Sequence, residues 1–143
     1  MCERRRGLTR GNAEAKVGHD GVRRILIVDD EPAVREVIAT VLADEGYAVQ
    51  MAPDGRIALD LIASAPPDLL ITDLMMPHVD GWAVLAHART HDPALPVILM
   101  SAVGPAMVRR TLPVPDHTDF LTKPFAIEEL LAIVVRRIGS PPI

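Results

Sequence analysis

The sequence predicts an α/β fold, a (βα)₅ doubly wound domain built around a parallel sheet. Two observations predict it. From residue 25 onward, short apolar runs alternate with segments of helical periodicity, and this alternation repeats five times. In addition, three of the five runs are apolar without interruption, which is typical of strands whose two faces are both covered by helices.

The predicted strands are short and evenly spread along the chain. In chain order they are 25–29, 47–51, 69–73, 97–100 and 119–122. Helices are predicted between and after them, where apolar residues recur three or four positions apart and proline or glycine stands at the ends. These apolar stripes lie within 34–42, 58–65, 84–88 and 127–138. The last stripe is the most regular and stops at Gly139.

The fourth helix is the weak element of this pattern. Its segment, 104–115, is bracketed by Pro105 and Pro113. A proline inside a helix removes a hydrogen bond and costs about 3 kcal/mol. We therefore expect a short or irregular helix at this point.

The chain length of 143 residues predicts a single domain, which we place at 23–138. Residues 1–22 are predicted to be a disordered basic tail, and residues 139–143 a frayed end. Residues 1–24 carry a charge of +4 and the remainder −8, for a total of −4. The tail lacks the aromatic residues and the binding motif of a nucleic-acid footprint, so we expect no direct contact with nucleic acid.

Composition excludes two classes of protein. The single cysteine, Cys2, cannot form an internal disulfide, which favours a reducing cytoplasm. No apolar run approaches the roughly 18–20 residues that span a bilayer, and the first residues lack the apolar segment of a secretory signal. We expect a cytoplasmic protein that does not enter a membrane.

Polar residues follow four of the predicted strands at the same end. Asp29 and Asp30 end the first strand, Asp73 the third, Ser101 the fourth and Lys123 the fifth. Ligands of open parallel sheets bind at this carboxyl edge. With the flavodoxin-like strand order 2-1-3-4-5, the strands that carry these residues are neighbours, so all five side chains converge on one crevice.

Three carboxylates in one crevice require a counter-charge. Two unit charges about 4 Å apart repel by roughly 4 kcal/mol at an effective dielectric near 20. An acidic pocket of oxygen ligands suits a hard divalent cation, and Mg²⁺ is the one that pairs with phosphates. One carboxylate then serves as a nucleophile that forms an acyl phosphate. Lys123 supplies a fixed positive charge and Ser101 a hydroxyl donor for the phosphoryl oxygens.

These motifs resemble the receiver domain of two-component response regulators over about residues 23–138. The matching pieces are the acidic pair in Ile27-Val-Asp-Asp-Glu-Pro32, the stretch from Asp73 to Gly81, Ser101-Ala102 and Lys123-Pro124-Phe125. The resemblance implies that Asp73 accepts a phosphoryl group from a sensor histidine kinase or a phosphotransfer protein. Receivers catalyse their own phosphorylation and dephosphorylation, so no further enzymatic activity is expected.

The resemblance also assigns the remaining residues. Asp30, Asp73 and the backbone carbonyl of Met75 are expected to bind Mg²⁺ directly, and Asp29 through metal-bound water. Ser101 and Lys123 match the switch hydroxyl and the phosphoryl-binding lysine.

Phe120 matches the aromatic switch residue, although it has no hydroxyl with which to bind a partner. The proline-bracketed fourth helix departs from the family pattern on the face that receivers use for output, which leaves the choice between a monomer and a weak phosphorylation-dependent dimer open.

Three functions remain in competition. The leading one is a single-domain response regulator without an output domain, which switches the binding of an unknown downstream protein. The second is a receiver-shaped interaction module that is not phosphorylated. The third is a phosphohydrolase with an aspartyl-phosphate intermediate, for which the chain offers no substrate cap.

Two other groups of residues are predicted to be structural. His87 and His91 lie four positions apart beside Asp92, a spacing that suits zinc, but no third ligand is evident and a solvated helix face is the better interpretation. Trp82, Met75 and Met76 are interpreted as packing around the start of the third helix.

Overall fold

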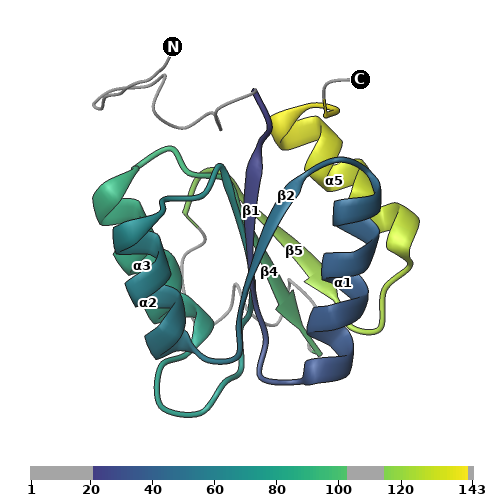
Figure 1. Cartoon of the computed structure of the whole chain (residues 1–143). Helices are drawn as coiled ribbons and strands as arrows, with labels where there is room; N and C mark the ends of the chain where they lie inside the picture. The colour runs from purple at the N-terminus through teal and green to yellow at the C-terminus, as the bar shows by residue number, and fades with distance from the viewer. Residues whose placement is uncertain (1–20, 103–114, 142–143) are drawn as a thin grey trace.

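Five parallel strands form one sheet in the order β2-β1-β3-β4-β5 in the computed structural model of the chain, which describes residues 21–102 and 115–141 (Figure 1). The strands are β1 (Arg24–Val28), β2 (Ala48–Ala52), β3 (Leu69–Asp73), β4 (Val97–Ser101) and β5 (Thr118–Thr122). This order confirms the predicted fold class. Every strand boundary lies within one residue of the predicted run.

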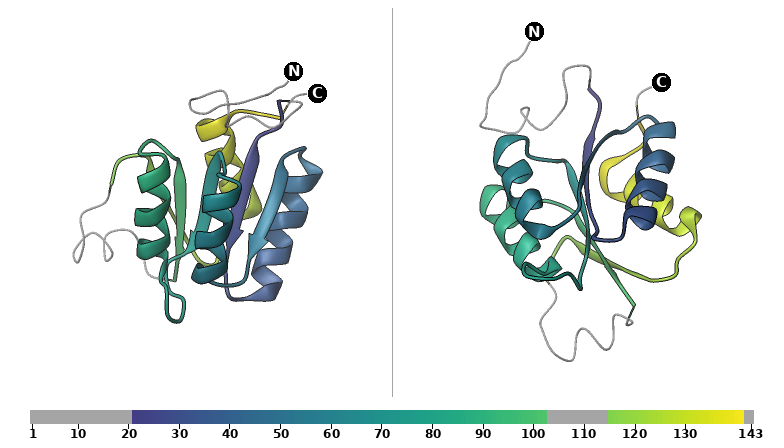
Figure 2. Two further views of the ribbon diagram at one scale, coloured as in Figure 1. Left: turned by 60° about the vertical axis from the view of Figure 1, so that its left-hand side comes forward. Right: turned by 60° about the horizontal axis from the view of Figure 1, so that its bottom comes forward.

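Helices cover both faces of the sheet. They are α1 (Pro32–Asp44), α2 (Gly55–Ser64), α3 (Gly81–His91) and α5 (Ile127–Ile138). As Figure 2 shows, α1 and α5 lie on one face and α2 and α3 on the other. The predicted fourth helix and nearly all of the predicted basic tail lie outside the described residues. Within the described part, no helix is long and apolar enough to cross a bilayer.

The helices begin where local capping allows them to. Pro32 occupies the first turn of α1, where its missing N–H group is not needed. The side chain of Asp54 caps α2 by accepting a hydrogen bond from the backbone of Ile57, and Asp80 caps α3 in the same way. As a result α2 and α3 each begin three residues before the apolar stripe that predicts them.

The sheet separates two apolar cores. The residues of β3 and β4 are buried throughout, as continuous apolar runs predict. Ile25, Ile71 and Ile98 point toward α1 and α5, whereas Leu26, Leu70 and Leu99 point toward α2 and α3. The side-chain alternation of each strand therefore supplies both cores at once.

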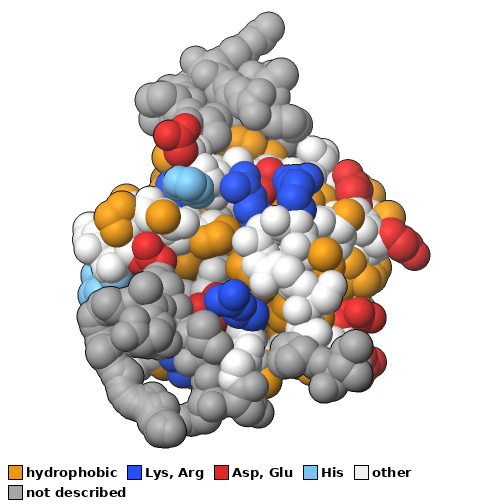
Figure 3. All heavy atoms as spheres, turned by 90° about the horizontal axis from the view of Figure 1, so that it is seen from above, with side chains coloured by type: hydrophobic (Ala, Val, Ile, Leu, Met, Phe, Trp, Pro, Cys, Tyr) orange, Lys and Arg blue, Asp and Glu red, His pale blue; other side chains and the backbone are white. Residues whose placement is uncertain are grey.

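Arg89 ties the elements together at the end of the sheet where the strands begin. Its Nε donates a hydrogen bond to the carbonyl oxygen of Leu95 at 2.9 Å, and its Nη2 donates to the carbonyl of His117 at 3.0 Å and to the hydroxyl of Thr118 at 3.1 Å. Figure 3 views this end and shows basic side chains, in blue, close to carboxylates, in red. One side chain of α3 thus fixes the segments that enter β4 and β5.

Candidate functional site

Three acids meet at the carboxyl edge of the sheet. Asp29 and Asp30 follow β1, and Asp73 is the last residue of β3. One carboxylate oxygen from each lies within 4.8 Å of the others, and no other group of three potential metal ligands occurs in the part of the chain that the structure describes. The predicted convergence of the three acids is therefore present.

Asp29 is held at all four of its polar atoms, and its side chain is fully buried. Its N–H group donates to Ala52 at 3.2 Å, and its carbonyl accepts from Nη1 of Arg35 at 2.6 Å. Its Oδ1 accepts from the N–H of Glu31 at 2.9 Å, and its Oδ2 from Nζ of Lys123 at 3.0 Å. This carboxylate is therefore a fixed part of the site.

Asp73 is nearly buried, with 7% of its surface exposed. Burial raises the pKa of this carboxyl above its ordinary value, and the negative charge of Asp29 raises it further. The positive charge of Lys123 and the N–H group of Met75 act in the opposite direction without cancelling the shift. The environment thus disfavours a negative charge on Asp73 unless more positive charge arrives.

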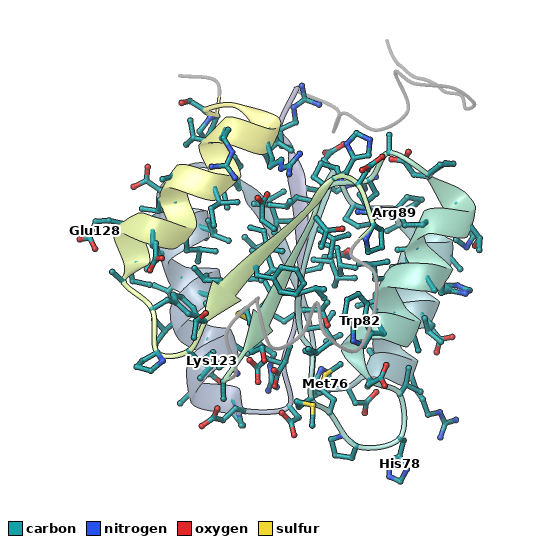
Figure 4. All side chains as sticks on the ribbon, turned by 180° about the vertical axis from the view of Figure 1, so that it is seen from behind. Met76, His78, Trp82, Arg89, Lys123 and Glu128 are labelled. Carbon is teal, nitrogen blue, oxygen red and sulfur yellow. The ribbon has the colours of Figure 1, made fainter. Side chains whose placement is uncertain are left out.

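Lys123 supplies the positive charge of the site. Its Nζ lies 3.0 Å from Oδ2 of Asp29 and 3.4 Å from Oδ2 of Asp73. Burial alone would lower the pKa of this amine, but the hydrogen bond and charge of Asp29, joined by Asp73, raise it above its ordinary value. Figure 4 shows Lys123 among carboxylate oxygens at this edge of the sheet. The amine is therefore charged and held between two acids.

Ser101 and the backbone of Lys123 are linked. Ser101 is the last residue of β4 and is almost fully buried. Its carbonyl oxygen accepts a hydrogen bond from the N–H group of Lys123 at 2.8 Å. The hydroxyl-bearing residue and the lysine are thus fixed side by side at the ends of neighbouring strands, as predicted from their positions.

Phe120 lies in β5 and faces the core that α2 and α3 cover. Its ring meets the ring of Trp82 edge to face, with centroids 6.4 Å apart and an angle of 66° between the planes. Figure 4 shows Trp82 near the start of α3, at the same end of the molecule as Lys123. Phe120 of β5 therefore contacts α3, the helix that follows the strand ending at Asp73.

Asp30 and Met75 are the exposed members of the predicted set. The side chain of Asp30 is solvent-exposed, and 72% of Met75 is exposed. Because the Met75 side chain does not pack in the core, the predicted packing role of this residue is wrong. Its predicted metal-binding group is its backbone carbonyl, for which side-chain exposure is no obstacle.

The donor set fits a hard divalent cation. It consists of carboxylate oxygens, it lacks nitrogen and sulfur ligands, and it includes a buried acid whose charge is disfavoured. Such ligands suit Mg²⁺ better than zinc or copper. By contrast, His87 and His91 lie with ring centroids 5.1 Å apart on α3, and no third ligand joins them among the described residues.

Sequence reasoning missed two contacts of the site. Arg35, in the second turn of α1, holds the carbonyl of Asp29, and its only signal in the sequence is a cation shortly after the acidic pair. The pairing of Trp82 with Phe120 joins residues far apart in the chain. Neither contact follows from local spacing.

The whole domain matches a known family. The family model of the response regulator receiver domain matches residues 25–135. Response regulator MprA of Mycolicibacterium vanbaalenii is 46% identical over 109 residues, which are 76% of this chain and 47% of that protein. MprA of Mycobacterium tuberculosis is 45% identical over the same length. This chain thus spans about half the length of the curated relatives it matches.

Solved structures agree with this match. Chemotaxis protein CheY4 of Vibrio cholerae superposes with a TM-score of 0.75 at 29% identity, over 81% of this chain and 98% of that one. The receiver domain of the Francisella response regulator 1452 gives a TM-score of 0.73 at 32% identity, over 81% and 96% of the two chains. Both similarities extend over nearly the full length of the solved domain.

Proposed function

This chain belongs to the response regulator receiver domain family, and from that premise we propose that it accepts a phosphoryl group on Asp73 in a Mg²⁺-dependent reaction of two-component signalling. One observation carries the proposal. The Lys123 amine lies 3.4 Å from Asp73 and 3.0 Å from Asp29, so a nucleophilic acid, a second acid and a fixed cation share the carboxyl edge of the sheet.

The proposed reaction is a transfer between two side chains. A carboxylate oxygen of Asp73 bonds to the phosphorus of a partner's phosphohistidine as the phosphorus–nitrogen bond breaks. The electron pair leaves with the imidazole, which takes its proton from solvent. Lys123 pairs with a phosphoryl oxygen, and the hydroxyl of Ser101 donates a hydrogen bond to another.

We assign the metal to Asp30, Asp73 and the backbone carbonyl of Met75, with Asp29 acting through metal-bound water. When bound, Mg²⁺ neutralises the carboxylates and orients the phosphoryl oxygens. Asp29 suits an indirect role, because both of its carboxylate oxygens already accept hydrogen bonds. The exposed Asp30 suits a direct one.

The donor protein is a sensor histidine kinase or a phosphotransfer protein. A groove of about 570 Å³ begins at Lys123 and runs between the first turns of α1 and the segment 124–127. Val34, Val37 and Phe125 line it, and Val37 is 53% exposed. We place the donor in this groove because it is apolar and opens next to the acceptor site.

The output is a switch in partner binding. Movement of Ser101 toward the phosphoryl group is proposed to be matched by a change in Phe120, whose ring is already in contact with Trp82. The setting is proposed to be cytoplasmic. The expectations of a stand-alone receiver, of a disordered tail and of a monomer or weak dimer stay predictions.

One experiment tests the acceptor assignment. The purified chain is incubated with Mg²⁺ and acetyl phosphate, the acyl phosphate is trapped, and mass spectrometry locates it. Asp73→Asn should abolish labelling. Asp60→Asn, which changes an exposed acid on α2, is the matched control and should label as the natural sequence does.

The outcomes separate the competing functions. Labelling that persists in Asp73→Asn would overturn the assignment. Binding of Mg²⁺ without labelling would favour an interaction module that is not phosphorylated. Rapid turnover of many phosphate esters would favour a phosphohydrolase.

A further inference from the structure

The loop between β3 and α3, residues 74–80, is closed at its base. The N–H group of Leu74 donates to the carbonyl of Met100 at 2.8 Å, and the carbonyl of Leu74 accepts from the N–H group of Gly81 at 3.0 Å. A Cβ atom on Gly81 would lie 2.5 Å from the carbonyl oxygen of Asp73. Both ends of the loop are therefore packed against the backbone of Asp73 and Leu74.

The far part of this loop rests on α2. A Cβ atom on Gly55 would lie 2.6 Å from Cβ of Val79 and 2.7 Å from its carbonyl oxygen, below the 3.0 Å that such contacts essentially never cross. Gly55 is buried in the first turn of α2, directly after the capping residue Asp54. Val79, through its Cβ and Cγ1 atoms and its carbonyl oxygen, thus occupies the space that a side chain at position 55 would need.

Backbone conformation does not explain this glycine. Three described glycines have a positive φ, a backbone conformation that favours glycine: Gly21, Gly46 and Gly139. Gly55 is not among them. Alanine forms helices more readily than glycine and would be favoured at this position if helix stability alone mattered. The close approach of Val79 is therefore the feature that requires a residue without a side chain.

We propose that Gly55 is a positioning residue for the phosphoryl-accepting site. Because Gly55 has no side chain, Val79 can pack closely against α2. This contact fixes the 74–80 loop, which follows Asp73 and carries the Met75 carbonyl. The three atoms nearest to a Cβ at position 55 all belong to Val79, and none belongs to the acids or to Lys123. This inference rests on the proposed function, because it gives the loop a role in holding Mg²⁺.

The test compares Gly55→Ala with the natural sequence in three measurements. Mg²⁺ affinity is followed through the fluorescence of Trp82, the single tryptophan of the chain, which directly follows Gly81. We expect the Mg²⁺ dissociation constant to rise roughly tenfold, since loss of the contacts that hold metal ligands in place typically costs about 10- to 100-fold in metal affinity. Amide hydrogen exchange of residues 74–81 should accelerate in metal-free protein, and the melting temperature reports overall folding.

Two further variants serve as a control and as a second test of the inference. Arg56→Ala changes the exposed neighbour of Gly55 in the same helical turn and should leave the Mg²⁺ affinity unchanged. Val79→Ala keeps the glycine, removes two methyl groups from the contact, and should weaken Mg²⁺ binding in the same direction by a smaller factor. If Gly55→Ala does not fold, the same measurements on Val79→Ala test the inference.

The outcomes are distinct. A folded Gly55→Ala protein with natural Mg²⁺ affinity and natural exchange in the loop would overturn this inference and leave the proposed function standing, even if its melting temperature fell. A natural-sequence protein without Mg²⁺ affinity would overturn the proposed function and this inference together. Weaker Mg²⁺ binding by Gly55→Ala, together with faster amide exchange in residues 74–81, would support the inference.

Discussion

The Lys123 amine is hydrogen-bonded to Asp29, at 3.0 Å from its Oδ2, rather than to the proposed phosphoryl acceptor alone. The Asp29 side chain is fully buried, and that of Lys123 is 20% exposed. A buried carboxylate with such a partner is strongly destabilised if the partner is removed. The lysine therefore has a structural role that does not depend on phosphorylation.

Lys123→Met should destabilise the metal-free protein at neutral pH by about 2–3 kcal/mol. This is below the roughly 3–5 kcal/mol of a fully buried pair, because the amine is partly solvated. Urea unfolding measures the change. Arg136→Met, which breaks an exposed ion pair with Asp119, is the control and should cost about 0–1 kcal/mol. Equal losses in the two variants would contradict the structural role of Lys123.

Asp73→Asn should leave the metal-free melting temperature at neutral pH unchanged or higher. Because the pKa of Asp73 is raised by burial, the natural protein loses stability as pH rises from the ordinary carboxyl value of 3.8 through the folded-state pKa. The advantage of the variant should therefore vanish in acid. Thermal melts of both proteins in EDTA, from acid to neutral pH, provide the measurement. A marked loss of stability of Asp73→Asn at neutral pH would contradict the idea that the charge of Asp73 destabilises the metal-free site.

Arg35→Met should cost about 1–3 kcal/mol, the usual penalty when a partly buried polar group loses its partner. The lost contact is the 2.6 Å hydrogen bond to the carbonyl of Asp29. Arg56→Met, on the exposed side of α2, should change stability by no more than about 0.5 kcal/mol. The comparison requires chemical denaturation of both variants, and identical midpoints would show that the Arg35 contact does not persist in solution.

Trp82 and Phe120 should be energetically coupled. A double-mutant cycle with Trp82→Leu and Phe120→Leu is expected to give a coupling of about 0.5–1.5 kcal/mol, as for other edge-to-face aromatic pairs. Phosphorylation should also change the fluorescence of Trp82, and Phe120→Leu should reduce that change. Strictly additive effects on stability would argue that the two rings do not interact.

Tyr47→Phe should cost about 1 kcal/mol, because the Tyr47 hydroxyl donates a 2.7 Å hydrogen bond to the carbonyl of Gly139 at the end of α5. Burial, with a smaller contribution from Glu45, raises the pKa of Tyr47 above 10.0. The stability that this tyrosine contributes is complete below that pH and is lost as pH rises through the folded-state pKa. The difference in unfolding free energy between the two proteins should be present at neutral pH and should shrink at strongly alkaline pH. A difference that stays constant across this range would refute the assignment.

Much of the fold could be predicted from the sequence, because its signals are local. Continuous apolar runs located β1, β3 and β4, and strand ends placed Asp73 and Lys123 at one edge. The apolar stripe at 58–65 begins three residues after α2 does, because the helix starts with the Asp54 cap and the packing glycine Gly55. A pattern of apolar spacing cannot detect either.

The finer structure of the site depends on tertiary contacts. Lys123 lies 94 positions from Asp29 along the chain, so its closer contact with Asp29 than with Asp73 follows from how β1 and β5 are placed, and not from any motif. Such preferences of about half an ångström lie beyond what residue spacing encodes.

Arg89 links three segments of the chain at the end of the sheet where the strands begin. At the strand-entry end, its three hydrogen bonds join α3 to the segments before β4 and β5. At the opposite end, Asp29, Asp73 and Lys123 lie at or directly after the ends of β1, β3 and β5. A chemical change at Asp73 is therefore expected to alter the surface at the carboxyl end of the sheet. The strand-entry end is expected to keep its conformation, so that a binding partner would sense the change at one end only.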